Sequence, residues 1–196
     1  MDIQQLRDHM ATILSPSRYL HSLGVEEVAR DMAVIFGYEE EKAAIAGILH
    51  DCAKYLTEEE LLAESEKHHL DISDVERECP FLLHGKVGAV FARLRYGIEE
   101  EEILNSIVYH TTGRPGMTLL EKIIFTADYI EPYRKPLPRI EEIRRAAYTE
   151  LDRGVLLILE NMLNYLRETG AVIDMVTDTT FLYYQSQCMA KEKYLS

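Results

Sequence analysis

The chain has 196 residues, 47% of them hydrophobic and 28% charged, which is the composition of a globular protein long enough for a real core. Its 34 acidic and 21 basic residues give a formal charge of −13, which argues against general nucleic-acid binding because that function needs Lys and Arg to neutralise phosphates. A small polyanion is not excluded as a ligand, since a cation and a few arginines can reverse the field inside one pocket.

The cysteines and the first residues predict a reducing, cytoplasmic setting. Cys52, Cys79 and Cys188 are odd in number and lack CxxC spacing, so neither a disulfide framework nor a zinc knuckle is indicated. The first ten residues, MDIQQLRDHM, are polar and charged, and no apolar run reaches membrane-spanning length. We therefore expect neither a membrane nor a nucleic acid as a partner.

Capping signals predict the first helices. Asp2 is the expected N-cap of a short helix, and Ser15 with Pro16 supplies an N-cap and an N1 proline for a long helix that ends near Gly37. A third helix is expected over about 39–53.

Further capping signals divide the middle of the chain. Thr57 and Glu60 form a capping-box pattern for a helix that stops before Leu70. A short helical turn after Ser73 is broken at Pro80. Helices are expected beyond it over about 81–96, 99–109, 118–130, 140–150 and 152–169, with a last one after residue 178.

Gly and Pro predict two loops, at 110–116 and at 131–138. Alternating β-branched hairpin patterns are lacking, so we expect an all-α fold with orthogonal or bundle-like packing. The loop at 131–138 is the one candidate subdomain boundary.

Residues of metal-binding type stand in apolar helical stripes. His21, for example, continues the helix face that carries Val25 and Val28. Burying such polar side chains without partners would cost roughly 1–3 kcal/mol each, and a shared cation would supply the partner. The set comprises His21, His50, His84, His110 and Asp128, with Asp51 directly after His50.

The specificity of this signal comes from the ordered set. A single histidine on an apolar face is more often a hydrogen-bonded core residue than a ligand, and the His-Asp dipeptide alone is a weak motif. The remaining histidines, His9, His68 and His69, lie among polar and charged neighbours, as surface residues do. The contrast between the two groups predicts a metal site.

Imidazole and carboxylate ligands without a thiolate suit Fe, Mn, Co or Zn in a catalytic site, because structural zinc favours cysteine. Two histidines and two aspartates would leave positions of an octahedral ion open for water and substrate. Such an ion lowers the pKa of water and polarises a phosphoryl oxygen.

Five motifs carry a resemblance to a known family. They are SRYLHS at 17–22, GILHDCAK at 47–54, HGKVGA at 84–89, HTTGRPGM at 110–117 and LEKIIFTADYIEPYR at 120–134. Their order, H…HD…H…H…D, resembles the HD superfamily of metal-dependent phosphohydrolases. The flanking residues resemble the bacterial YqeK family of symmetrical bis(5'-nucleosyl)-tetraphosphatases over about residues 15–185.

The resemblance implies a single HD domain over residues 1–196, with a metal-binding core at about 15–135 and covering helices at about 140–196 on the same core. It implies metal-dependent hydrolysis of diadenosine tetraphosphate between its central phosphates to give two ADP. Iron is the expected metal, with Mn, Co or Zn as alternatives. Water activated by the metal would attack a central phosphorus, and ADP would leave.

The resemblance also assigns roles by position. It assigns the role of metal ligand to His21, His50, Asp51 and Asp128. It leaves open whether His84 and His110 face the phosphates or hold a second ion, so the number of ions is also open. The residues expected to act directly in catalysis are Asp51, His84, His110 and Asp128.

Cationic and hydroxyl side chains near the motifs are candidates to bind the substrate. Arg18 lies one helical turn before His21, and Lys54, Arg114 and Arg134 could balance charge on the phosphoryl group. The alternative for these cations is a solvated or snorkelling surface position. The expected substrate-binding set is Arg18, His21, Lys54, His84, His110, Thr111, Arg114 and Arg134.

Other functions fit the same pattern. One is another HD-type nucleotide phosphohydrolase, such as a nucleoside monophosphatase or an alarmone hydrolase. A second is a non-catalytic nucleotide-sensing module, and a third is a helical scaffold that binds no metal. The sequence leaves open which groups hold the adenine and whether the protein forms a homodimer.

Overall fold

The computed structural model describes residues 1–195, with side chains to residue 191, and all the regular secondary structure in this part of the chain is helical. In chain order the elements are α1 (Ile3–Ile13), α2 (Pro16–Phe36), α3 (Glu40–Leu49), α4 (Glu58–Lys67), α5 (Asp74–Glu78), the 3-10 helix η1 (Pro80–Leu83), α6 (His84–Tyr96), α7 (Glu101–Tyr109), α8 (Leu119–Ile130), α9 (Ile140–Thr149), α10 (Leu151–Thr169) and α11 (Met175–Leu195). The expected all-α fold is confirmed.

The predicted helix starts are confirmed at their caps. Ser15 accepts a hydrogen bond from the Arg18 backbone N–H, and Asp2, Thr57 and Thr118 each form a complete capping box. These caps satisfy N–H groups that a helix start leaves without a partner. Local side chains therefore set where these helices begin.

Two predicted helix boundaries are wrong. The third helix ends at Leu49 instead of continuing to residue 53, because the backbone changes there to i→i+3 hydrogen bonds, such as that from Cys52 N to Leu49 O at 3.0 Å. The last helix begins at Met175, before residue 178, because Asp174 accepts the Val176 N–H at 2.8 Å and caps it.

Glycines allow two close helix crossings. A Cβ on Gly47 of α3 would lie 2.8 Å from the Cα of Glu26 on α2, and a Cβ on Gly85 of α6 would lie 2.8 Å from the backbone oxygen of Val108 on α7. Both crossings need a residue without a side chain. The first brings the end of α3 to α2, and the second brings the start of α6 to the end of α7.

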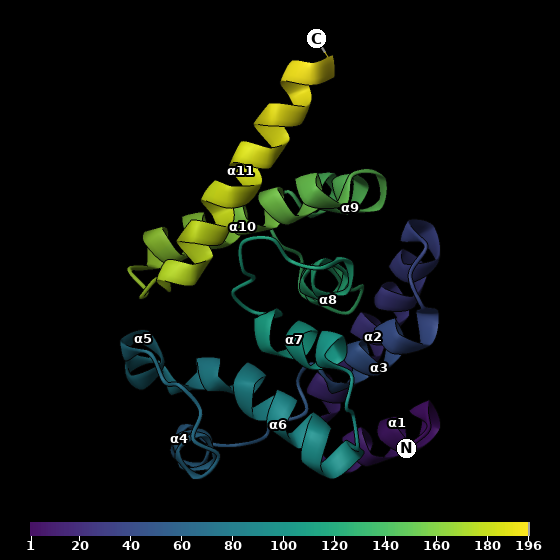
Figure 1. Cartoon of the computed structure of the whole chain (residues 1–196), viewed down its shortest axis with the longest axis vertical. Coiled ribbons are helices and arrows are strands. Elements are labelled where there is room, and N and C mark those ends of the chain that lie inside the picture. The colour runs from purple at the N-terminus through teal and green to yellow at the C-terminus, as the bar shows by residue number, and fades with distance from the viewer. Residues whose placement is uncertain (196) are drawn as a thin grey trace.

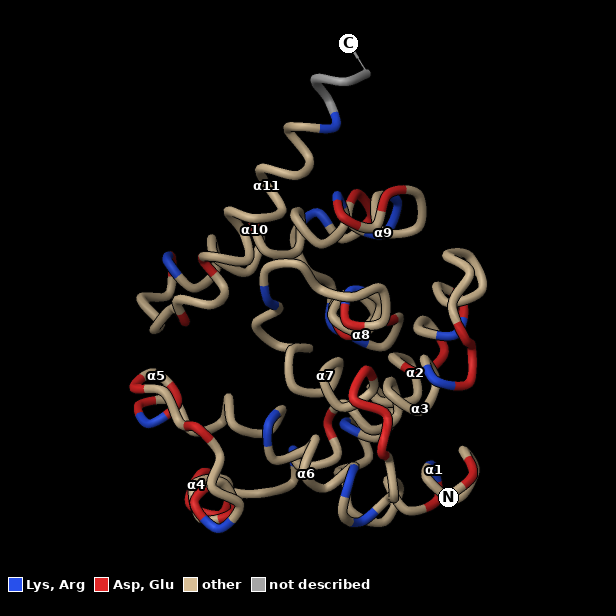
Figure 2. The backbone as a smooth tube through the Cα atoms, viewed as in Figure 1, with Lys and Arg blue, Asp and Glu red and all other residues tan. Residues whose placement is uncertain are grey.

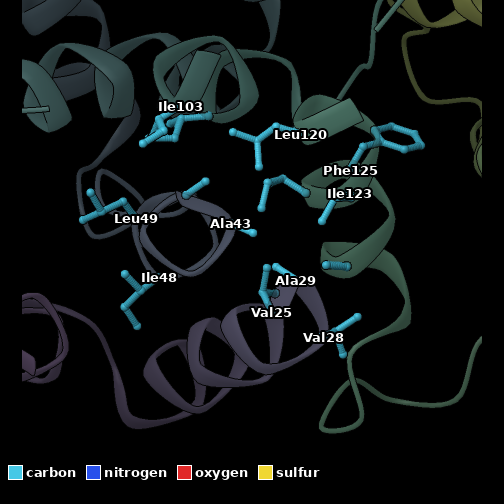
Figure 3. Packing of buried hydrophobic residues seen from close by; sticks show 14 of the residues in the cluster. Val25, Val28, Ala29, Ala43, Ile48, Leu49, Ile103, Leu120, Ile123 and Phe125 are labelled. Atoms are coloured by element: carbon cyan, nitrogen blue, oxygen red, sulfur yellow. The ribbon is translucent and has the colours of Figure 1, made fainter. Parts of the chain in front are cut away.

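The core lies between α2, α3, α7 and α8. Figure 3 shows Val25 and Ala29 of α2 near Ala43 of α3 and Ile123 of α8, with Ile103 of α7 farther along the same core. All of these side chains are buried. The polar residues at the ends of these helices are therefore held by a closely packed frame.

The C-terminal helices lie on one side of this core. In Figure 1, α9, α10 and α11 lie above α8, and the end of α11 extends beyond the other helices. Val155 and Leu159 of α10 and Tyr184 of α11 belong to the same buried cluster as Val25 of α2. The last helices therefore cover the core that the first eight build.

Charged residues of both signs are scattered over the molecule (Figure 2). The basic residues do not gather into a single stripe over the part of the chain that the structure describes, which agrees with the formal charge of −13. Among the described helices, we find none with the length and apolar character needed to span a bilayer.

Candidate metal centre

The polar residues predicted from the apolar stripes converge on one point. His21 comes from α2, His84 from the start of α6, and Asp128 from the last turn of α8. The ends of α3 and α7 contribute the others, which are His50, Asp51 and His110. The four histidines and Asp51 are buried, with no more than 8% of any of them exposed.

Asp51 lies between two groups of histidines. Its Oδ2 atom is 3.3 Å from His50 Nε2 and 3.8 Å from His21 Nε2. Its Oδ1 atom is 3.3 Å from His84 Nε2 and 3.6 Å from His110 Nε2. Within each group the candidate ligand atoms lie within 4.8 Å of one another. One carboxylate could therefore serve two neighbouring metal positions.

Asp128 completes the first group. Its Oδ1 atom lies 3.0 Å from His21 Nε2 and 3.9 Å from His50 Nε2. The first group thus offers two imidazoles and two carboxylates, and the second offers two imidazoles and the shared carboxylate of Asp51.

Hydrogen bonds fix which ring nitrogen of each histidine faces the centre. The Nδ1 atoms of His50 and His110 lie 2.7 Å from the backbone oxygens of Gly47 and Ile107. The Nδ1 atom of His84 likewise faces a backbone oxygen, that of Phe81. A carbonyl oxygen only accepts, so each Nδ1 carries a proton, and in the neutral ring the Nε2 lone pair points into the centre.

These facing nitrogens fit a cation. The Nε2 atoms of His84 and His110 lie 3.0 Å apart, and those of His21 and His50 lie 3.2 Å apart. Lone pairs of two imidazoles that face each other, as those of His84 and His110 do, repel at such a distance unless positive charge lies between them. Nitrogen ligands about 2.0–2.1 Å from one ion at right angles would be about 3 Å apart, which matches.

The environment sets the charge of these groups. Burial lowers the pKa of His84 to about 4, so its ring is neutral near pH 7. Burial acts to raise the pKa of Asp128, but the hydrogen bond with His21 and the charge of Arg134 outweigh it and hold that pKa well below its usual range. Neutral imidazoles and ionised carboxylates are the forms that bind a metal.

Glu131 is a residue of the centre that the sequence analysis missed. Its side chain is fully buried, and Oε1 accepts a hydrogen bond from His21 Nδ1 at 2.9 Å. Carboxylates commonly orient metal-bound histidines in this way. The available signal was its position three residues after Asp128, one helical turn along the same face. It was read as part of the proline-rich loop instead.

Six of the expected substrate-binding residues line a pocket of about 250 Å³ that opens onto the centre, namely Arg18, Lys54, His84, His110, Thr111 and Arg134. Arg18 Nη1 lies 2.7 Å from Asp51 Oδ2, and Arg134 Nη2 lies 2.8 Å from Asp128 Oδ1. Lys54 Nζ lies 3.2 Å from His84 Nε2, and Thr111 Oγ1 lies 3.1 Å from His110 Nε2. The pocket therefore combines metal-ligand atoms with cationic donors.

Two expected substrate-binding residues do not line this pocket: His21 lies at the metal centre beneath it, and Arg114 lies away from the centre. Its guanidinium forms two hydrogen bonds, of 2.9 and 2.8 Å, to the buried carboxylate of Glu121. Its carbon Cζ also lies 5.0 Å from the centre of the Tyr109 ring. These contacts hold the side chain against α8.

Comparison with known proteins agrees with this geometry. The family model described as "HD domain" matches residues 18–133, the segment that contains all six residues of the centre. The chain therefore belongs to the HD domain family, a class whose histidines and aspartates form the kind of centre described above.

Proteins with similar sequences show which group within the HD domain family the chain resembles. The chain is 39% identical to the "Bis(5'-nucleosyl)-tetraphosphatase, symmetrical" of Bacillus subtilis over 92% of its own length and 90% of that protein. It is 41% identical to the protein of the same name from Halalkalibacterium halodurans, over 88% and 90% of the two chains. Within the HD domain family, the chain belongs with these symmetrical tetraphosphatases.

A solved structure of similar sequence has the same fold. A Clostridium acetobutylicum protein, described as a predicted HD superfamily hydrolase involved in NAD metabolism, superposes with a TM-score of 0.92. The two share 37% sequence identity, and the match covers 95% of this chain and 98% of the other.

Proposed function

We propose that this protein is a hydrolase that cleaves diadenosine tetraphosphate between its two central phosphates and releases two molecules of ADP. The observation that carries the proposal is the buried centre, in which Asp51 lies between two histidine pairs at the floor of a pocket lined by Arg18, Lys54 and Arg134. The family membership of the chain supports the same activity.

The metal ligands in this proposal are His21, His50, Asp51 and Asp128. A bound transition metal supplies Lewis-acid chemistry, because it polarises a phosphoryl oxygen and lowers the pKa of water. The imidazole and carboxylate donors without a thiolate support a transition metal, and we propose iron as the native ion.

His84 and His110 have two alternative roles, and the geometry favours one of them. Both rings direct an Nε2 lone pair toward Asp51 Oδ1, at 3.3 and 3.6 Å. In the tautomer with the proton on Nδ1, Nε2 has no proton to donate to a phosphate oxygen. We therefore propose that these two histidines and Asp51 hold a second ion, which would let the centre bind both sides of the cleaved bond.

The cationic residues balance the charge of the substrate. Arg18 and Arg134 each use one nitrogen to hold a carboxylate of the centre. A guanidinium has five N–H donors, so the remaining ones are free to bind phosphate oxygens. Lys54 adds a third cation, and the pocket places all three beside the atoms where charge develops during phosphoryl transfer.

We further propose that the described helices act as one HD domain in the cytoplasm. The shared buried cluster of α2, α8 and α10 supports a single domain. The three free cysteines suit a reducing compartment.

Product analysis tests the proposed function. The wild-type protein with Fe²⁺ or Mn²⁺ should convert diadenosine tetraphosphate to ADP as the sole nucleotide product, measured by anion-exchange chromatography. Asp51→Asn should abolish the reaction because it removes the shared ligand, whereas Asp31→Asn, at an exposed site on α2, should not. ATP with AMP as products, or equal activity in the Asp51→Asn variant, would contradict the proposal.

A further inference from the structure

A second hollow opens beside the metal centre. Its volume is about 380 Å³, within the usual range for small-molecule sites. It shares Tyr129, Arg134 and Met162 with the central pocket, so the two spaces adjoin along these side chains. A ligand with its phosphates at the centre could therefore extend into this hollow.

The lining of the hollow differs from that of the centre. Five of its residues are apolar or aromatic, namely Tyr129, Leu137, Pro138, Met162 and Tyr165. The Tyr165 side chain on α10 is 65% exposed, although it is large and aromatic. Flat aromatic surfaces stack on nucleobases, whereas phosphates need charged donors. The hollow thus suits the base of a nucleotide.

Asn161 provides a polar group with a fixed orientation there. Its Nδ2 atom lies 2.6 Å from the backbone oxygen of Pro138 and 3.1 Å from the hydroxyl of Tyr129. The Pro138 oxygen can only accept, so the amide nitrogen must face it. The Oδ1 atom accepts no hydrogen bond from the described residues, and it can accept one from an amino group on a base.

Arg134 joins the two spaces. Its Nη2 atom holds Asp128 at the centre, and its Cζ atom lies 5.9 Å from the ring centre of Tyr129 in the hollow. Its Nε–H is buried and has no hydrogen-bond partner among the described residues. A buried N–H without a partner carries a cost that a phosphate oxygen would relieve. Arg134 thus lines both the centre and the hollow and has a donor without a partner among the described residues.

We infer that this hollow is a nucleoside subsite, which receives the base and ribose of one half of the dinucleotide. The base lies against Tyr165, Asn161 Oδ1 accepts a hydrogen bond from its amino group, and Arg134 binds a phosphate of the same half. The inference rests on the proposed function for the identity of the substrate. It adds a reason for central cleavage. A nucleoside held in the hollow beside the metal centre determines which phosphorus of the chain lies at that centre.

Kinetics test the subsite with a matched pair of tyrosine variants. Tyr165→Ala should raise the KM for diadenosine tetraphosphate about fivefold or more, the effect of losing one base–aromatic stack, and should change kcat less than twofold. Tyr183→Ala, which removes a tyrosine of α11 outside the hollow, should leave both constants unchanged. Inorganic tetraphosphate has no base, so its inhibition constant should be the same in all three proteins.

Photolabelling locates the subsite directly. The probe is a diadenosine tetraphosphate analogue with an azide on C8 of both adenines and a methylene in place of the central bridging oxygen, which hydrolysis cannot cleave. At least one labelled peptide should lie within residues 129–168, and Tyr165→Ala should reduce that label. Labelling confined to other segments, or an unchanged KM in Tyr165→Ala, would overturn the inference. Failure of the wild-type protein to release ADP would refute the proposed function separately, because the labelling result does not depend on turnover.

Discussion

Replacing Glu131 by glutamine tests whether the centre depends on a residue outside the ligand set. In the native side chain Oε1 accepts from His21 Nδ1, and Oε2 accepts from the backbone N–H of Tyr133. Glutamine has the same shape but only one acceptor oxygen. One of the two N–H groups must then face the amide NH2 group, and the negative charge that supports His21 is also lost.

The size of the effect follows from this mismatch. A buried donor without an acceptor costs roughly 1–3 kcal/mol, which corresponds to about a 5- to 150-fold change in an equilibrium constant. Partners of metal-bound histidines typically change metal affinity by about 10–100-fold when mutated. We therefore expect Glu131→Gln to weaken Mn²⁺ binding by about 10–100-fold, with retention of the helical fold.

Calorimetric titration with Mn²⁺ at pH 7.5 would measure this change, and circular dichroism would check the fold. Glu99→Gln is the matched control, because Glu99 is exposed before α7 and is not among the residues of the centre. An Mn²⁺ affinity within twofold of wild type in a folded Glu131→Gln protein would refute the assignment of Glu131 as the group that orients His21.

Two further predictions concern Arg114 and the protonation of His21. Arg114→Gln should lower the free energy of unfolding, measured by urea denaturation, by about 1–3 kcal/mol. The reason is that the buried Glu121 carboxylate loses the donors of the guanidinium. A large rise in KM without loss of stability would instead favour a direct contact between Arg114 and the substrate. Burial opposes protonation of His21, but hydrogen bonds with Asp128 and Glu131 raise its pKa to about 9 in the metal-free protein. The imidazolium therefore stabilises the metal-free fold fully below pH 6.5, and this contribution is lost as the pH rises through about 9. Because a metal must displace that proton, Mn²⁺ affinity should rise by about tenfold per pH unit between these values, and a flat calorimetric profile would contradict this.

Capping and hydrophobic periodicity were sufficient to predict most helices. Thr118 with Glu121 and Thr57 with Glu60 act within one turn of their own helix, so their effect is readable from the sequence alone. The end of α3 was harder, because nothing local stops a helix after Leu49. After Leu49 the chain turns by i→i+3 hydrogen bonds and His50 contacts His21 of α2, a long-range contact that sequence periodicity does not contain.

The ligand set was also predictable, but its surroundings were not. Four histidines on apolar faces stand out because unpaired burial is costly. Arg114 shows the limit of this reasoning, since an arginine beside a motif residue can face either the pocket or a buried carboxylate. Tyr165 shows another limit, because an aromatic residue on a helix with an apolar face is read as core unless neighbouring elements reveal a hollow.

The helix ends explain how the chain directs three of its histidines. His50 and His110 follow the last residues of α3 and α7, and His84 follows η1. In each case Nδ1 faces the backbone oxygen three residues earlier, and for His50 and His110 this oxygen lies in the last turn of an α-helix, where carbonyls lack intrahelical partners. One local arrangement thus satisfies an orphan carbonyl, selects the tautomer and turns Nε2 toward the centre. The carbonyl ends of α3 and α7 also carry partial negative charge, which favours a cation at the point where they meet.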